Sequence, residues 1–186
     1  MVFGLLRRRR DDGIGALYAA IVAQARRPVF YVDLAVPDTV EGRFELMVLH
    51  CGLVVARLGR DDATRETGTR LAEAFFDDMD RTLRETGVGD VTVPKKMKKI
   101  ASAFYGRLTA YEAAGDRAAL AEALARNVYD GAAPAGVAEA LAAYAEAAIA
   151  ALGAADPAAL AAADIPWPRP AFPAGAATTS GAHGPT

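Results

Sequence analysis

The sequence predicts an all-α protein: a single domain of about six mostly antiparallel helices with flexible N- and C-terminal tails. Apolar residues recur at intervals of three and four along most of the 186 residues, the period of helices packed on one core. Glycine, proline and aspartate residues that begin or end helices separate these stretches. Alternation typical of a strand is confined to PVFYVDLAV, residues 28–36. We therefore expect a basic tail over residues 1–13, a helical domain over 14–164, and a disordered tail rich in Pro, Gly and Ala over 165–186.

The first helix is expected to begin near residue 14. One amphipathic stripe defines it, formed by Ile14, Leu17, Tyr18, Ile21, Val22 and Ala25. Residues 28–36 should then connect it to the next helix as an extended segment.

A capping box of Asp38 and Glu41 is expected to start the second helix, which ends near Arg60. Its apolar stripe consists of Val40, Phe44, Met47, Cys51, Val54 and Leu58. His50 adjoins this stripe and has no evident acid or nucleophile partner. We therefore expect it to be a packed, hydrogen-bonded core residue.

Two longer helices follow. The third covers about residues 64–86, and Gly87 is its expected left-handed stop. Its stripe is Leu71, Phe75, Met79 and Leu83. The fourth runs from Pro94 to Gly115 with the stripe Met97, Ile100, Phe104, Leu108 and Tyr111. Gly106 lies inside this helix, where glycine is unfavourable, so we expect another backbone to approach closely there.

The last helices are rich in alanine. Asp116 should cap the fifth, which carries Leu120, Leu124 and Val128. Pro134 should open the sixth, with Leu141, Tyr144, Ala148 and Leu152 on its buried side. A short turn capped by Asp156 follows, and in the tail beyond it Trp167 is expected to dock on the body.

Composition excludes several classes of protein. Cys51 is the only cysteine and there are only two histidines, so we expect a reducing compartment and no metal site, cofactor or catalytic residue. The net charge of −2 and pI of about 5.7 argue against DNA binding. No apolar run approaches the roughly 20 residues of a membrane span. The basic start imitates a secretory signal, but two aspartates and an amphipathic helix follow it, so we expect a cytoplasmic protein.

The candidate binding site is a lysine cluster just after Pro94, made of Lys95, Lys96, Lys98 and Lys99. A helix start carries a partial positive charge, so an exposed cation there is unfavourable by about 0.3–1 kcal/mol. Asp90 offsets only part of the positive charge, and Arg107 borders the same face. The cluster predicts an anionic partner; the alternative is an ordinary solvated face.

The best candidate for chemistry is FFDDMDR, residues 75–81. Asp77, Asp78 and Asp80 are similar to the aspartate-rich helix with which all-α prenyl transferases hold magnesium diphosphate. Arg81 takes the place of an aspartate of that motif, and no second motif follows. Spacing favours salt bridges from Asp77 to Arg81 and from Asp80 to Arg84 on a solvated face. A small all-α enzyme of isoprenoid or quinone chemistry remains the alternative.

One long segment resembles a known family. MDRTLRETGVGDVTVPKKMKKIASAFYGRLTAY, residues 79–111, resembles the signature of the ubiquinol-cytochrome c chaperone family, found in mitochondria and in bacteria related to them. VPDTVEGRFELMVLHCGLVVARL, residues 36–58, resembles an upstream segment of that family, and Tyr18 with FYVDLAVPD suits its opening. The resemblance covers roughly residues 16–129.

The resemblance implies a non-enzymatic assembly factor for respiratory complex III. Mitochondrial members bind newly made cytochrome b, act with a small partner subunit and associate with ribosomes. For this chain it implies cytochrome b as client, with a ribosome or an anionic membrane surface, and a small partner subunit or a second copy, as further partners. It also implies a position on the cytoplasmic face of the inner membrane, to which MVFGLLRRRR could help hold the chain. A general ribosome-associated factor is the other alternative.

Overall fold

The computed structural model describes the backbone of residues 2–171 and the side chains from Gly13 to Ala171. Eight helices follow one another within the described residues: α1 (Val2–Ala25), α2 (Pro28–Val32), α3 (Val40–Gly59), α4 (Arg65–Glu85), α5 (Val93–Glu112), α6 (Arg117–Val128), α7 (Val137–Ala154) and α8 (Pro157–Ala161). No strand occurs between residues 2 and 171, so the all-α prediction is confirmed. The six longer helices correspond to the six that the sequence predicts. The side chains of residues 1–12 and everything after residue 171 lie outside the described part.

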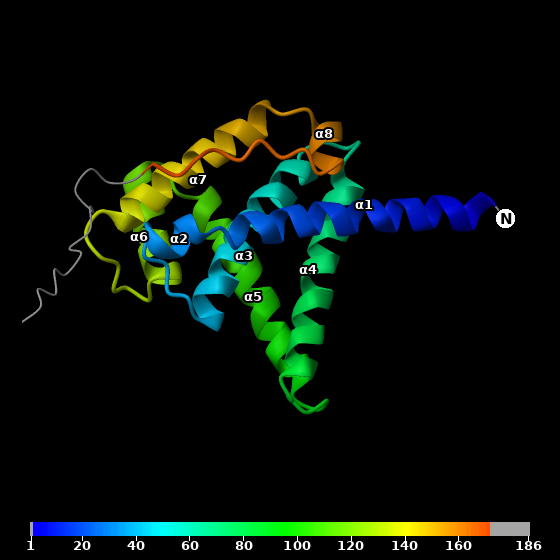
Figure 1. Cartoon of the computed structure of the whole chain (residues 1–186), viewed down its shortest axis with the longest axis horizontal. Coiled ribbons are helices and arrows are strands. Elements are labelled where there is room, and N and C mark those ends of the chain that lie inside the picture. Colours follow the sequence, from blue (N-terminus) through cyan, green and yellow to red (C-terminus); the bar gives the residue numbers. More distant parts are fainter. Residues whose placement is uncertain (1, 172–186) are drawn as a thin grey trace, which may run out of the picture.

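Helix α3 forms the centre of the domain. It contacts α1, α4, α5, α6, α7 and α8, and it buries 11 of its 20 residues. The body therefore assembles around α3, with α6 and α7 packed together on one side of it (Figure 1).

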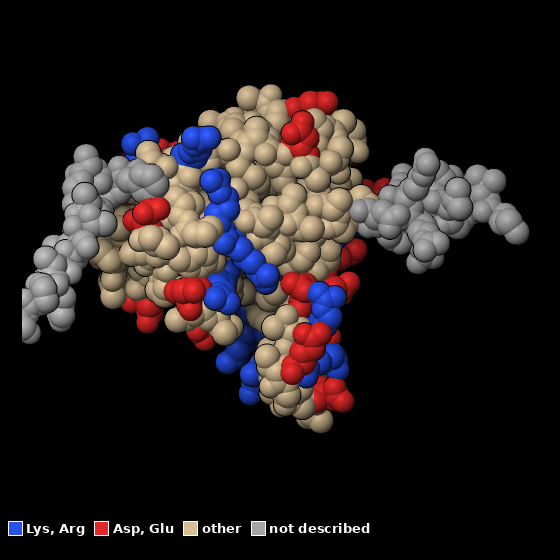
Figure 2. Space-filling model, viewed as in Figure 1, with Lys and Arg blue, Asp and Glu red and all other residues tan. Residues whose placement is uncertain are grey.

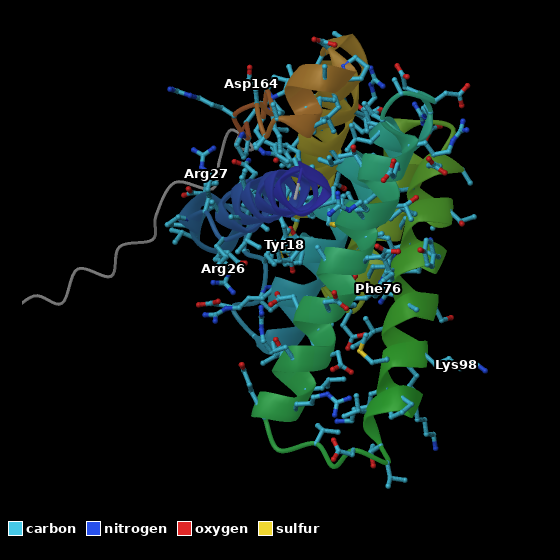
Figure 3. All side chains as sticks on the ribbon, turned by 90° about the vertical axis from the view of Figure 1, so that its right-hand side faces the viewer. Tyr18, Arg26, Arg27, Phe76, Lys98 and Asp164 are labelled. Atoms are coloured by element: carbon cyan, nitrogen blue, oxygen red, sulfur yellow. The ribbon has the colours of Figure 1, made fainter. Side chains whose placement is uncertain are left out.

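Helices α4 and α5 form an antiparallel hairpin that projects from this body (Figure 1). Near the body they share an aromatic cluster, in which the ring centroids of Phe75 and Phe104 lie 4.9 Å apart and those of Phe76 and Phe104 lie 5.4 Å apart. Figure 3 shows Phe76 between the two helices. Residues 86–92 join the helices at the far end, which we call the hairpin tip.

The connection after α1 differs from the prediction. Residues 28–32 form the short helix α2 rather than an extended segment. Pro28 suits a first helical turn, and Phe30 is fully buried, with its ring centroid 5.0 Å from those of both His50 and Tyr144. The strand-like alternation was misleading because packing against distant residues decides this segment. Helix α1 also begins at Val2 rather than near Ile14.

Two helix starts are shifted. Thr39, rather than Asp38, caps α3 by accepting a hydrogen bond from the Gly42 amide at 3.1 Å, so the predicted capping box is wrong by one residue. Val40 is 78% exposed and does not belong to the buried stripe. Helix α7 begins at Val137 instead of Pro134, because Gly136 adopts a φ of 78° immediately before it.

Several local predictions are confirmed. Gly87 has a φ of 81° where α4 ends. Asp116 and Asp156 cap α6 and α8 by accepting hydrogen bonds from backbone amides. Gly106 contradicts its prediction: it is exposed, and a Cβ atom there would meet nothing within 4 Å.

His50 and the C-terminal segment close the core. His50 is fully buried; its Nδ1 lies 2.7 Å from the Leu46 carbonyl oxygen and its Nε2 lies 2.8 Å from the Tyr144 hydroxyl. The Gln24 amide donates to that same hydroxyl at 2.9 Å. Trp167 packs edge-on against His50 with ring centroids 5.1 Å apart, so its predicted docking is confirmed.

One described helix, α7, is long and apolar enough to cross a membrane, which the sequence analysis did not expect. Length and composition alone are weak evidence, because core helices pass the same test. In this fold α7 packs on α3 and α6 and buries eight of its residues.

Candidate functional site

The lysine cluster lies on the first two turns of α5, beside the hairpin tip. Lys95, Lys96, Lys98 and Lys99 are all exposed, whereas Met97 and Ile100 between and after them are partly buried. Figure 3 shows Lys98 pointing away from α4 into solvent. The alternation follows from helical geometry, because the residues that face α4 are the apolar ones.

The lysines are distinguished by what they do not contact. Among the described residues at least eight arginines pair with carboxylates: Arg43, Arg60, Arg65, Arg81, Arg84, Arg107, Arg117 and Arg126. Within the described residues none of the four lysines has a carboxylate within salt-bridge distance. Figure 2 shows blue and red side chains interleaved along the α4 edge of the hairpin and blue ones along its α5 edge. In the described part of the chain these four neighbouring lysines are thus not neutralised by ion pairs.

Two residues that the sequence associated with the lysines have other partners. Asp90 accepts a hydrogen bond from Arg84 at 2.6 Å, across the hairpin tip. Arg107 donates through Nε and Nη2 to the two carboxylate oxygens of Glu45, at 2.8 and 2.6 Å. Glu45 lies on α3 with a side chain only 7% exposed, so Arg107 anchors the hairpin to the body. Because Glu45 is 62 residues away in the chain, no local pattern could have indicated this pair.

The sequence analysis missed Val91. This side chain is 96% exposed at the hairpin tip, between Gly89 and Pro94. Residues 84–99 around it contain five basic and two acidic side chains, a net charge of +3 in a chain whose net charge is −2. An apolar residue inside a glycine- and proline-bounded turn was the available signal.

Two of the three aspartates of α4, Asp78 and Asp80, form structural contacts. Asp78 accepts a hydrogen bond from the Tyr18 hydroxyl at 2.8 Å and pairs with Arg81, so the predicted Asp77–Arg81 pair is wrong. The predicted Asp80–Arg84 pair is confirmed at 2.6 Å. Asp77 is exposed. No group of three or more potential metal ligands occurs among the described residues.

An apolar groove of about 220 Å³ lies between α3, α5 and α7. Its lining includes Leu53, Leu108 and Ile149, and its charged side chains, Arg57, Arg60 and Glu112, already have partners. Arg57 donates to the carbonyl oxygens of Leu152 and Ala155 at the end of α7, and Arg60 lies 3.6 Å from Glu112. The aspartates of α4 are not among the residues lining this groove. The groove therefore lacks the carboxylate cluster that the prenyl-transferase alternative requires.

Comparison with known proteins agrees with the family resemblance found in the sequence. The model of the ubiquinol-cytochrome C chaperone family matches residues 32–167. The crystal structure of the Cbp3 homolog from Brucella abortus superimposes with a TM-score of 0.80 at 40% sequence identity, covering 91% of this chain and 97% of that one. A search of curated proteins gave no significant match. The chain therefore belongs to the ubiquinol-cytochrome c chaperone family, whose members are chaperones and not enzymes.

Proposed function

We propose that this protein assists the assembly of respiratory complex III by binding newly made cytochrome b at the cytoplasmic face of the inner membrane. Membership of a family named for ubiquinol-cytochrome c chaperones supports a role in the assembly of complex III. Cytochrome b is the client that the resemblance to this family implies. Because cytochrome b is itself a membrane protein, a chaperone that binds it while it is being made works beside the bilayer. The protein then needs a surface that contacts an anionic partner there.

The observation that carries this proposal is the lysine cluster without carboxylate partners. Exposed arginines such as Arg117 and Arg126 form ion pairs, whereas Lys95, Lys96, Lys98 and Lys99 face solvent beside one another at a helix start. Four like charges there cost stability, which an anionic partner would offset. Near an anionic membrane each lysine contributes about 1 kcal/mol of attraction.

The first test replaces the four lysines together by glutamine. The fold should survive and gain slightly in stability, because glutamine has nearly the helix propensity of lysine and relieves repulsion with the helix start. Complex III should accumulate poorly in a strain carrying only this variant, and salt-sensitive association with membranes or ribosomes should fall. The measurements are a thermal melt, fractionation, and quantification of assembled complex III.

A matched control is the double variant Arg117→Gln and Arg126→Gln, which removes exposed positive charge from α6, where both residues pair with glutamates. It should leave complex III at the normal level. Normal assembly in the lysine variant with an intact fold would contradict the proposal. Selective loss of ribosome association, with membrane association kept, would instead favour the ribosome-associated alternative.

A further inference from the structure

We propose that the hairpin tip docks end-on onto an anionic lipid bilayer, with Val91 entering the headgroup region and the four lysines contacting lipid phosphates. This inference rests on the proposed function for its biological role and names the partner of the same surface.

The shape of the hairpin supports an end-on contact. The α4–α5 hairpin projects from the body, and residues 86–92 form its far end (Figure 1). Val91 has the largest exposed fraction, 96%, of the large apolar side chains in the described part of the chain. Burial inside the domain does not explain an apolar side chain at that position. Contact with the boundary between headgroups and acyl chains would remove it from water.

The distribution of charge fits a flat anionic surface. Lys95 to Lys99 span about 6 Å along the axis of α5, which is less than the Debye length of about 8 Å at physiological ionic strength. When the tip touches an anionic plane, salt therefore does not fully screen that plane's attraction for any of the four ammonium groups. The nearest carboxylate of the turn, Asp90, is held by Arg84, and Glu85 is the other acidic side chain among residues 84–99.

The same distribution argues against RNA as the main partner. Single-stranded RNA is bound along grooves that combine spaced positive charges with aromatic platforms. Beyond Lys99 the next basic side chain of α5 is Arg107, which is engaged by Glu45. Tyr105, 52% exposed, packs edge-on against Phe104 and tilted against Phe76. On α5, charge that no carboxylate neutralises thus lies only at the end next to the tip and does not extend along the helix.

Site-specific labelling can test the contact directly. The native Cys51 is fully buried, and burial raises the pKa of its thiol to about 12, so it will not compete for a thiol-reactive dye. Full-length protein with Val91→Cys is labelled with an environment-sensitive fluorophore and mixed with vesicles of phosphatidylcholine and phosphatidylglycerol. Val40→Cys is the matched control, because Val40 is also a highly exposed valine but lies at the start of α3.

We expect a blue shift of emission at position 91 with anionic vesicles, little shift with phosphatidylcholine alone, and none at position 40. In vesicle flotation, Val91→Asp and the quadruple lysine variant should each bind at least about tenfold more weakly, whereas Val40→Asp should bind like the original protein. No shift at position 91, or equal shifts at both positions, would overturn the inference. So would a shift produced by a single-stranded RNA oligonucleotide but not by vesicles.

The vesicle experiments use purified protein and do not depend on complex III. If vesicle binding fails while the lysine variant still impairs complex III, the tip has another partner and the proposed function stands. If vesicles bind as expected while the lysine variant assembles complex III normally, the docking stands and the proposed role of the lysines is wrong.

Discussion

His50 lies at the centre of the core as a neutral imidazole. It is surrounded by Tyr144 of α7, Phe30 of α2 and Trp167 of the C-terminal segment, and its hydrogen bonds go to a carbonyl and a hydroxyl. Removal from water disfavours the imidazolium and lowers the pKa of His50 to about 4. The histidine that was expected to be a packed core residue therefore holds four segments of the chain together.

This pKa predicts a pH dependence of stability. Between pH 6.5 and about 4 the unfolded chain binds a proton at His50 and the folded chain does not. The contribution of His50 is therefore complete above pH 6.5 and declines as pH falls to about 4, by about 3 kcal/mol in total. Urea unfolding of the original protein and of His50→Gln at pH 7 and pH 5 checks this. An equal loss of stability in both proteins would contradict the assignment.

At the scale of elements, two glycines in helices have opposite roles. A Cβ atom at Gly42, near the start of α3, would lie 2.0 Å from the backbone carbonyl oxygen of Pro37. A Cβ atom at Gly106 in α5 would meet nothing within 4 Å. Gly42 therefore allows the preceding segment to approach α3, whereas Gly106 only weakens its own helix.

Alanine at each position should separate these roles. Gly106→Ala should stabilise the protein by about 0.5–1 kcal/mol through helix propensity. Gly42→Ala gains the same propensity but should destabilise by about 1–3 kcal/mol, because backbone must shift to admit the methyl group. Chemical denaturation of the two variants measures both effects. If Gly106→Ala instead destabilised the protein, this result would support the sequence prediction that another backbone approaches Gly106 closely.

Helices could be predicted from the sequence where the periodicity of nearby residues determines them. Features that depend on contacts between residues far apart in the chain could not. The stripes of α3 to α7 and the caps Asp116 and Asp156 follow from residues a few positions apart. Helix α2 depends on Phe30 meeting His50 and Tyr144, which adjacent residues do not encode. In the candidate site, the sequence located the lysines but not the ion pair that removes Arg107 from their group.

At the scale of the whole molecule, the pair of Arg107 and Glu45 connects the hairpin to the body. The Arg107 side chain is 26% exposed and that of Glu45 only 7%, so solvent screens this pair less than the ion pairs of the outer surface. Loss of the arginine would leave a buried carboxylate without its donor.

Arg107→Gln should therefore destabilise the protein by about 2 kcal/mol while leaving vesicle binding unchanged. The exposed pair of Arg117 with Glu146 offers a control, since Arg117→Gln should cost less than about 1 kcal/mol. Thermal melts and vesicle flotation compare the two variants. If Arg107→Gln left stability unchanged but weakened vesicle binding, Arg107 would have to be counted with the lysine cluster as part of the membrane-binding site.

The length of the hairpin sets the distance between its tip and the body of the protein. Helix α5 rises about 20 Å from Val93 at the tip to Arg107 at the body. A hairpin that stands upright on the bilayer works as a spacer, and it holds the body above the membrane by about that height. A helix with its side chains is about 10 Å across, so a client segment could leave the bilayer and lie in this gap beneath the chaperone.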